Sequence, residues 1–155
     1  EADELEVDGF EFRSQVIDAK KRLDRGAVAF CIFVGQEFTH IAWISLNQQA
    51  KDSCDEPPCK VDFSNHEAYV GSTRTSPKYR RMGFDAYGSL KRRQFMKEKG
   101  VVTSRSAVPK KNIVSQKSSA KVSAGIYGEG RYLKILSWKS WKEKPLIHSN
   151  SIHQD

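Results

Sequence analysis

Residues 73–87 have the sequence TRTSPKYRRMGFDAY and are the most informative segment for predicting the fold and the function of this chain. The residue before Pro77 is held extended, so the segment predicts a strand that ends just before this proline. A basic loop follows, and a helix is predicted to begin near Gly83. The first N–H groups of a helix have no partner within it and attract anions. With Arg80 and Arg81 beside them, they predict a site for a pyrophosphate group.

Strands and helices alternate on both sides of this segment. Residues 28–34 form a nearly continuous apolar run, which predicts a strand buried on both faces. Residues 67–75 form a further strand, and the crossover from it through a helix to the next strand predicts one parallel pair. The class is therefore α/β (α+β), with one mixed sheet. The other expected elements are a helix through Phe12, Val16, Ala19 and Leu23, a strand over 38–46, helices over 82–99 and 113–122, a strand over 101–108, and a last strand pair that turns at 128–130.

The length of 155 residues suits a single domain. We expect this domain to span residues 1–142 and residues 143–155 to form a tail. Residues 47–63 are polar and are expected to form a long loop, with a short strand as an alternative. No apolar run reaches the roughly 20 residues that span a bilayer, so we expect a cytoplasmic protein. Because the sequence lacks an initiator Met, the question of a targeting signal stays open.

Charge is distributed unevenly along the chain. Residues 1–70 contain seven Lys and Arg and fourteen Asp and Glu, whereas residues 71–144 contain nineteen and four. Such an excess of positive charge suits an anionic ligand: a nucleic acid, an acidic membrane surface or a phosphate-rich cofactor. A solvated basic face explains it equally well. On the 82–99 helix, Lys91, Arg92 and Arg93 are expected on such a face, away from Met82, Ala86, Leu90 and Met96.

The three cysteines allow few interpretations. Cys31 lies in an apolar run and is predicted to be a buried small hydrophobic residue. Cys54 and Cys59 flank a pair of prolines, and they form a local disulfide only if the compartment is oxidising. A zinc site needs about four ligands, and this segment offers two, so no metal is expected.

Two motifs resemble those of the GNAT acetyltransferase superfamily. In the first, a strand leads through a proline to an Arg-x-x-Gly turn, which Arg80 and Gly83 supply here. In the second, a strand is followed by Asn112 and Ser115 at the start of a short helix. The resemblance covers residues 27–141. It implies a mixed, mostly antiparallel central sheet with flanking helices and a splayed parallel strand pair.

The same resemblance implies a binding site for acetyl-CoA. The pantetheine arm would add alongside the strand that ends at the proline, and the phosphates would meet the following turn. Asp85 departs from the family pattern, which has a small residue there, because a carboxylate repels phosphate unless it caps the helix or pairs with an arginine. The residues implied in binding are Thr73, Thr75, Arg80, Arg81, Met82, Gly83, Phe84, Asp85, Asn112 and Ser115.

The resemblance also implies a reaction in which an amine attacks the thioester directly. Such a reaction uses a proton acceptor and a proton donor. For the acceptor we expect Glu67, at the start of its strand, with His66 beside it. The donor in many relatives is a tyrosine on the short helix, but that position here falls at Ser119, and the nearest tyrosine is Tyr127. Ser119, Tyr127 or water is therefore the expected donor.

The leading hypothesis is an acetyl-CoA-dependent N-acyltransferase that acts on a small or peptidic primary amine in a ternary complex. One alternative is a GNAT-like domain that binds acyl-CoA without catalysis, which Asp85 and the missing tyrosine favour. The other is a basic nucleic-acid-binding module. The sequence argues against nucleic acid because it has no recognised motif and no exposed aromatics interleaved with its basic residues. The amine acceptor and the oligomeric state, including a homodimer, stay open.

Overall fold

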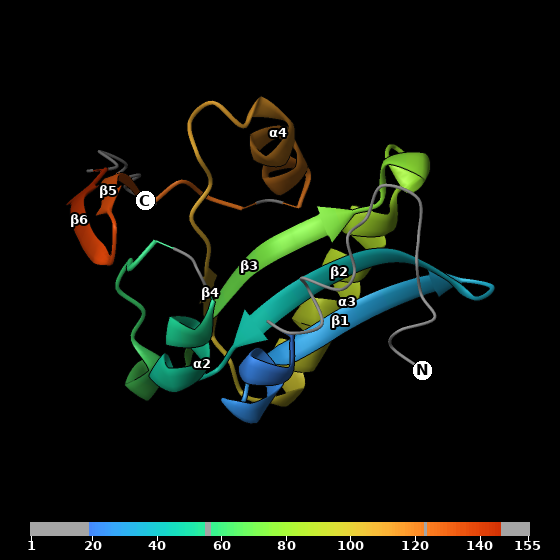
Figure 1. The fold of residues 1–155 in the computed structure, drawn as a ribbon, viewed down its shortest axis with the longest axis horizontal. Helices are drawn as coiled ribbons and strands as arrows, with labels where there is room; N and C mark the ends of the chain where they lie inside the picture. Colours follow the sequence, from blue (N-terminus) through green and yellow to red (C-terminus); the bar gives the residue numbers. More distant parts are fainter. Residues whose placement is uncertain (1–18, 55–56, 123, 147–155) are drawn as a thin grey trace, which may run out of the picture.

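The computed structural model describes residues 19–54, 57–122 and 124–146 (Figure 1). Its main feature is a four-stranded sheet in the order β1-β2-β3-β4. β1 (Val28–Val34), β2 (Glu37–Ser45) and β3 (Glu67–Thr75) pair antiparallel, and β4 (Thr103–Arg105) pairs parallel to β3. The predicted mixed, mostly antiparallel sheet with one parallel pair is therefore confirmed.

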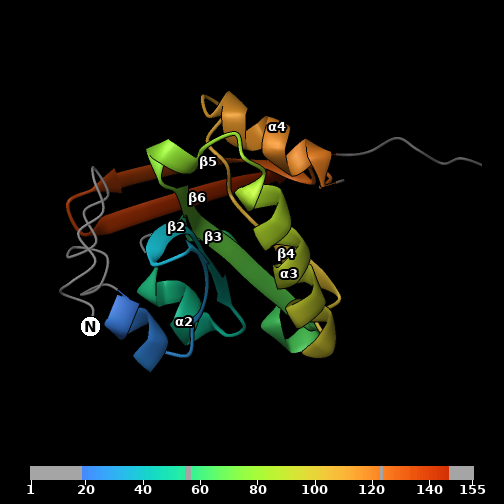
Figure 2. The same ribbon diagram turned by 90° about the vertical axis from the view of Figure 1, so that its right-hand side faces the viewer.

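Helices cover both faces of this sheet (Figure 2). α3 (Phe84–Glu98) packs on one face, and α2 (Gln48–Ser53) lies with the helical residues 19–24 on the other. β2 is buried along nearly its whole length because it lies between two strands and two helical layers. The buried clusters are Ile44, Ala68 and Met96 on the α3 side, and Ala27, Phe38, Ile41, Trp43 and Ala50 on the α2 side.

Two further units lie beyond the sheet. α4 (Ile113–Lys121) follows β4 and lies beside the N-terminal end of α3 (Figure 2). β5 (Gly128–Ile135) and β6 (Trp138–Pro145) form a separate antiparallel pair. Two short 3-10 turns, η2 (Phe63–Asn65) and η3 (Pro77–Tyr79), stand directly before and after β3.

Residues 47–63 contain a helix, where the sequence predicted a loop or a short strand. Asn47 is the N-cap of α2, and its side-chain oxygen accepts a hydrogen bond of 2.8 Å from the backbone N–H of Ala50. Ala50 and Lys51 are buried. A cap of this kind together with packing against the sheet stabilises a helix that would be too short to form alone.

The last hairpin turns at Leu136 and Ser137, so the predicted turn at residues 128–130 is wrong. The glycines have another role: a Cβ at Gly130 would lie 1.9 Å from a ring carbon of Trp141. The indole ring therefore occupies the space above Gly130, in the middle of the strand pair. β6 also continues to Pro145, into residues that the sequence assigned to a tail.

Burial differs from expectation at two places. Arg92 is buried inside the fold, whereas Ala86 and Leu90 are exposed, so the assignment of the α3 faces is wrong at these positions. β1 is an edge strand with no fully buried residue, so the prediction of a strand buried on both faces is wrong, and Cys31 on it is exposed. The apolar pattern did not predict that Arg92 is buried, because a buried arginine needs polar partners and one of these, His40, lies on a strand distant in the sequence.

Candidate functional site

β3 has one edge that is paired over only part of its length. β4 covers Glu67–Tyr69, and among the described residues no other strand continues beside β3 on that side. The rest of β3, as far as Thr75, extends for about 20 Å. An extended ligand can add to such an edge through backbone hydrogen bonds. Thr73 and Thr75 lie on this stretch, as the sequence predicted for β3.

A β-bulge interrupts β3 at the same stretch. Ile41 lies opposite Arg74 and Trp43 opposite Gly71, so β3 has one residue more than β2 between these pairs. Ser72 in the bulge has a left-handed φ of 49°. Bulges reorient groups of the strand and are common beside active sites. The bulge was not predicted from the sequence, although a glycine inside a strand, Gly71, is a signal for it.

The turn between β3 and α3 presents backbone N–H groups. Arg81 and Gly83 have left-handed φ angles of 65° and 85°. Gly83 is the N-cap of α3, and no side chain of the described residues caps this helix. The first N–H groups of α3 can therefore bind a ligand, and the helix dipole favours an anion there. Arg81 and Met82 are exposed, and Phe84 packs edge-on against Tyr79 with ring centroids 5.8 Å apart.

Side-chain hydrogen bonds hold the segment between β3 and α3 in place. Arg80 Nε donates a hydrogen bond of 3.4 Å to the carbonyl oxygen of Thr75 at the end of β3. Glu37, at the start of β2, accepts a hydrogen bond of 2.8 Å from Lys78 Nζ and a further one from the Tyr79 hydroxyl. Because Glu37 holds two of the three residues of η3, the turn is fixed against the sheet.

Asp85, the departure from the family pattern, is bonded within the protein. The Ser118 hydroxyl on α4 donates to its Oδ2, and the Arg92 guanidinium lies 3.9 Å from its Oδ1. Arg92 Nη1 lies 3.4 Å from Nε2 of the buried His40, whose Nδ1 lies 2.9 Å from the Thr75 hydroxyl. Burial, followed by the positive charge of Arg92, lowers the pKa of His40. A polar network thus joins β2, β3, α3 and α4.

The second motif forms the start of α4. Asn112 is the N-cap, and its side-chain oxygen accepts a hydrogen bond of 3.1 Å from the backbone N–H of Ser115. Asn112 therefore has the ordinary role of a helix cap in this structure. Ser119 lies near the other end of α4, where its carbonyl oxygen accepts from the N–H groups of Val122 and Ala124.

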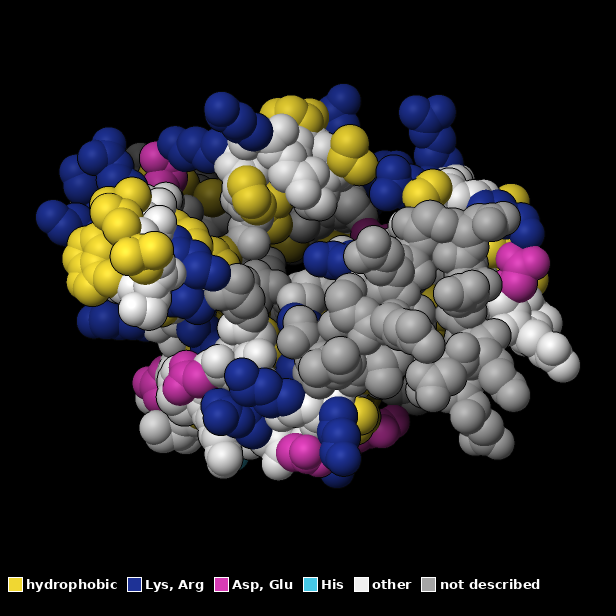
Figure 3. Space-filling view, in the orientation of Figure 1, with side chains coloured by type: hydrophobic (Ala, Val, Ile, Leu, Met, Phe, Trp, Pro, Cys, Tyr) yellow, Lys and Arg dark blue, Asp and Glu magenta, His cyan; other side chains and the backbone are white. Residues whose placement is uncertain are grey.

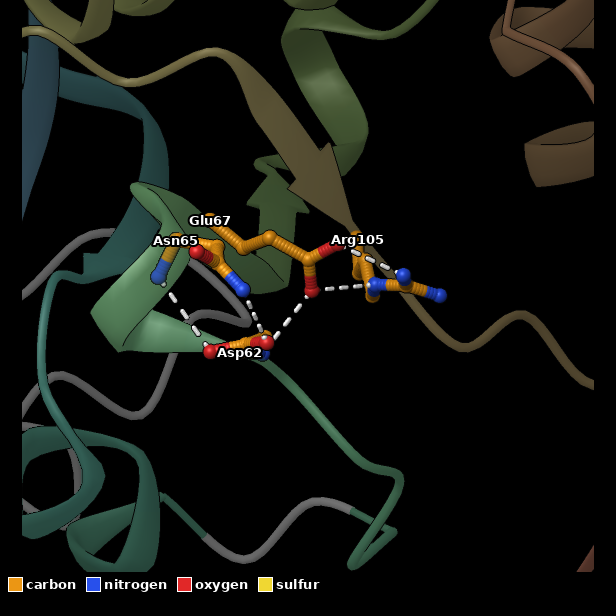
Figure 4. A network of polar contacts seen from close by, with 4 residues as sticks. All are labelled: Asp62, Asn65, Glu67 and Arg105. Carbon is orange, nitrogen blue, oxygen red and sulfur yellow. Dashed lines mark hydrogen bonds and ion pairs between the residues drawn. The ribbon is translucent and has the colours of Figure 1, made fainter.

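Glu67 is held by an arginine, Arg105, which is not among the predicted site residues (Figure 4). Arg105 on β4 donates through Nε and Nη2 to the two carboxylate oxygens of Glu67, each over 2.6 Å. The backbone N–H of Asp62 donates a further bond of 2.8 Å to the same carboxylate. The hydrogen bonds from Arg105 lower the pKa of Glu67, so this carboxylate is ionised at neutral pH. The signal in the sequence is Arg105 itself, a single charged residue inside a strand.

Tyr127 lies on the other side of the same arginine. The Arg105 guanidinium carbon is 4.4 Å from the centroid of the Tyr127 ring, which is cation–π geometry. Burial raises the pKa of the Tyr127 phenol, which keeps it protonated at neutral pH. Glu67 and Tyr127, two of the three predicted catalytic residues, are thus brought together by Arg105. Ser119 is instead part of α4.

The predicted residues therefore form two groups. The first, here called the turn group, comprises the end of β3, the turn and the start of α3, which α4 contacts through the hydrogen bond from Ser118 to Asp85. The second, the Arg105 group, comprises Glu67, Arg105 and Tyr127 at the paired end of β3 and β4. β3 connects the two groups, since it begins at Glu67 and ends at Thr75.

The surface around α4 and the β5–β6 pair carries many Lys and Arg side chains (Figure 3). Among the described residues, no group of three or more His, Cys, Asp or Glu side chains is placed to hold a metal ion. The described cysteines, Cys54 and Cys59 among them, form no disulfide. None of the described helices is long and apolar enough to cross a bilayer.

The fold is similar to that of solved aminoglycoside N-acetyltransferases. AAC(6')-Iy in complex with CoA aligns with a TM-score of 0.56 and 17% identity over 81% of this chain and 87% of that chain. Its complex with the bisubstrate analog CoA-S-monomethyl-acetylneamine aligns with a TM-score of 0.60 and 14% identity over 84% of each chain. The apo form of AAC(6')-IG from Acinetobacter haemolyticus aligns with a TM-score of 0.51 and 14% identity over 85% of this chain and 84% of that chain.

Sequence comparison adds no relative to these structures. No family model matches the chain, and no curated protein matches it. The identities of 14% and 17% establish a common fold rather than a common substrate. With its mixed sheet, its partly paired β3–β4 edge and its flanking helices, the chain has the GNAT acetyltransferase fold.

Proposed function

We propose that this protein is an acetyl-CoA-dependent N-acyltransferase that moves an acyl group to a primary amine by direct attack in a ternary complex. The observation that carries the proposal is the edge of β3 beyond Tyr69, beside which no strand of the described residues continues. It leads to a basic helix start that has no side-chain cap in the described part of the chain. A strand edge of this kind suits an extended amide-containing arm, and the helix start suits a pyrophosphate. Two of the structures with the same fold contain CoA or a CoA analog.

The turn group would hold the cosubstrate. Thr73 and Thr75 would contribute backbone groups of β3, while Arg80 and Arg81 would add charge-assisted bonds to the phosphates. Gly83 lets the phosphates approach the backbone because it has no side chain. Met82, Phe84, Asn112 and Ser115 would line the same site from the turn and from the start of α4.

The Arg105 group would handle the protons. Glu67 would hold the amine and accept its proton, directly or through a water molecule, when nitrogen attacks the thioester carbonyl carbon. Tyr127 would donate the proton that the sulfur takes when the carbon–sulfur bond breaks, and its position on the Arg105 guanidinium that also holds Glu67 supports this role. Ser119 on α4 is the other proposed donor.

Calorimetry with coenzyme A followed by a turnover assay tests the proposal. Saturable binding that Arg80→Ala and Arg81→Ala weaken, together with acetyl transfer to one or more amines of a panel, is the expected result. Lys60→Ala lies in the segment that precedes η2 and the start of β3, whereas the turn follows the end of β3, so this variant is the charge-matched control and should bind normally. Absence of binding at millimolar coenzyme A would rule the proposal out.

One observation favours a second candidate, an acyl-CoA-binding domain without catalysis. Glu67 is a weaker proton acceptor than an ordinary carboxylate because Arg105 lowers its pKa. The two candidates differ in turnover alone. Coenzyme A binding without acetyl transfer to any tested amine would favour the second, whereas turnover that Glu67→Gln abolishes would favour the first.

A further inference from the structure

The carboxylate of Asp85 stands in the first turn of α3, where a negative charge interacts favourably with the helix dipole but repels a phosphate bound at the helix start. Its side chain is about one-third exposed, with a relative surface area of 36%, and it contacts protein groups on two elements. Ser118 on α4 donates a hydrogen bond to one oxygen, and Arg92 faces the other at 3.9 Å. Asp85 thus connects α4 to a buried positive charge in α3.

The arginine in this arrangement is itself fixed in place. Arg92 Nη2 donates to the Ser89 hydroxyl at 2.8 Å, and Nη1 faces His40 Nε2. Since a guanidinium only donates, Nε2 of His40 accepts and Nδ1–H donates to the Thr75 hydroxyl. Gly88 permits this approach, because a Cβ there would lie 3.1 Å from His40 Nε2 and 3.3 Å from Arg92 Nη1.

We propose that Asp85 is a positioning residue that fixes α4 against the start of α3. Its charge is balanced by Arg92 and its oxygen is bonded by Ser118, so its role is to hold two elements together and not to meet the phosphates. The proposal rests on the proposed function, because α3 and α4 carry the residues that would surround acyl-CoA. It also accounts for a carboxylate at a position where the superfamily pattern has a small residue.

Hydrogen exchange of the unliganded protein tests the contact itself. Ser118→Ala should speed the exchange of α4 amides by about tenfold, the factor expected for one lost hydrogen bond to a charged group. Asp85→Asn keeps an oxygen that accepts from Ser118 but loses the charge, so it should speed the exchange by a smaller factor. Ser118→Thr retains the hydroxyl and should retain slow exchange. Glu98→Gln removes a carboxylate from the other end of α3 and is the matched control. Unchanged α4 exchange in both Asp85→Asn and Ser118→Ala would overturn the proposal.

Calorimetry with coenzyme A then distinguishes positioning from simple charge repulsion. If Asp85 positions α4, Asp85→Asn weakens binding about five- to tenfold although it removes a negative charge, and Ser118→Ala weakens it similarly. In turnover, the KM for acetyl-CoA should rise while the KM for the amine is retained. Tighter binding by Asp85→Asn would show that the carboxylate only repels phosphate and would overturn the proposal.

The two experiments separate this inference from the proposed function. Hydrogen exchange needs no ligand, so it decides the Asp85–Ser118 contact even if the protein does not bind coenzyme A. Binding by the wild-type protein with unaltered α4 exchange in the variants would instead retain the proposed function and reject the positioning role.

Discussion

The carboxylate of Glu67 accepts two hydrogen bonds from the Arg105 guanidinium, each 2.6 Å long. Both side chains are largely buried, with relative surface areas of 12% and 27%. Arg105 also stacks on Tyr127, so one cation contacts both residues proposed to exchange protons. The position of Arg105 therefore determines both the lowered pKa of Glu67 and the placement of Tyr127 near it.

Glu67→Gln should lower the free energy of unfolding by about 1–3 kcal/mol at pH 7, because a charge-assisted pair is lost. The folded-state pKa of Glu67 is lowered, so its contribution is present above the unfolded value and is lost as the pH falls through the folded one. Urea unfolding of the wild-type protein and of Glu67→Gln at pH 7 and at about pH 3 measures the difference in their free energies of unfolding. The two proteins should differ at pH 7 and converge at acidic pH; an equal difference at both would contradict the assignment. Glu98→Gln, on the exposed side of α3, is the control.

At the scale of elements, the turn before α3 depends on backbone conformation. Gly83 has φ of 85° at the start of α3, and Gly100 has φ of 73° after its end. In both cases a Cβ would meet nothing within 4 Å, so conformation alone opposes a side chain. The two glycines thus form a matched pair at opposite ends of one helix.

Gly83→Ala and Gly100→Ala should each destabilise the protein by about 1–2 kcal/mol, the cost of a left-handed conformation for a residue with a Cβ. Only Gly83→Ala should also weaken coenzyme A binding, because the turn group contains this position and not the other. Thermal unfolding and calorimetry on the same samples make the comparison. Equal loss of affinity in both variants would show that the effect is general destabilisation.

In the β5–β6 pair, the indole ring of Trp141 packs directly against the backbone of Gly130. Gly130 has a ring carbon of Trp141 where its Cβ would be, and Trp141 Nε1 donates a hydrogen bond of 2.8 Å to Glu143. The indole is therefore held from two sides. Tyr132 lies directly opposite Trp141 in the register of the pair.

Gly130→Ala should displace the Trp141 ring and destabilise the protein by about 1–3 kcal/mol, the usual cost of overpacking. Tryptophan fluorescence and thermal unfolding report the two effects. Gly125→Ala adds the same methyl group where nothing lies within 4 Å, so it should leave both signals nearly unchanged. A Gly130→Ala protein with wild-type stability would show that Trp141 can move without cost.

At the scale of the whole molecule, positive charge is concentrated in the second half of the sequence. Residues 71–144 carry nineteen Lys and Arg against four Asp and Glu. These residues supply the end of β3, the turn, α3, α4 and the last strand pair. The proposed phosphate site is therefore built from residues of the basic part of the chain.

Coenzyme A affinity should fall severalfold between about 50 and 500 mM salt, because the Debye length falls below 10 Å over this range and screens exposed charges. The Arg80→Gln and Arg81→Gln double variant should show a smaller salt effect, while Lys60→Gln should retain the wild-type effect. Calorimetry at several salt concentrations measures the slopes. A salt-independent affinity would place the phosphates away from this turn.

The sequence by itself determined the order of the elements from β1 to α4 apart from α2, the bounds of β3, the basic turn and the start of α4 at Asn112, because these follow from local periodicity, proline restriction and helix-start signals. Only the tertiary structure decided which residues meet across long sequence separations. Glu67 and Arg105 come together because a parallel pair aligns β3 with β4, and Asp85 meets Ser118 because α4 lies beside α3. Likewise, Gly130 looked like a turn residue until the packed indole of Trp141 explained it. Contacts of this kind depend on three-dimensional proximity, which local sequence preference does not specify.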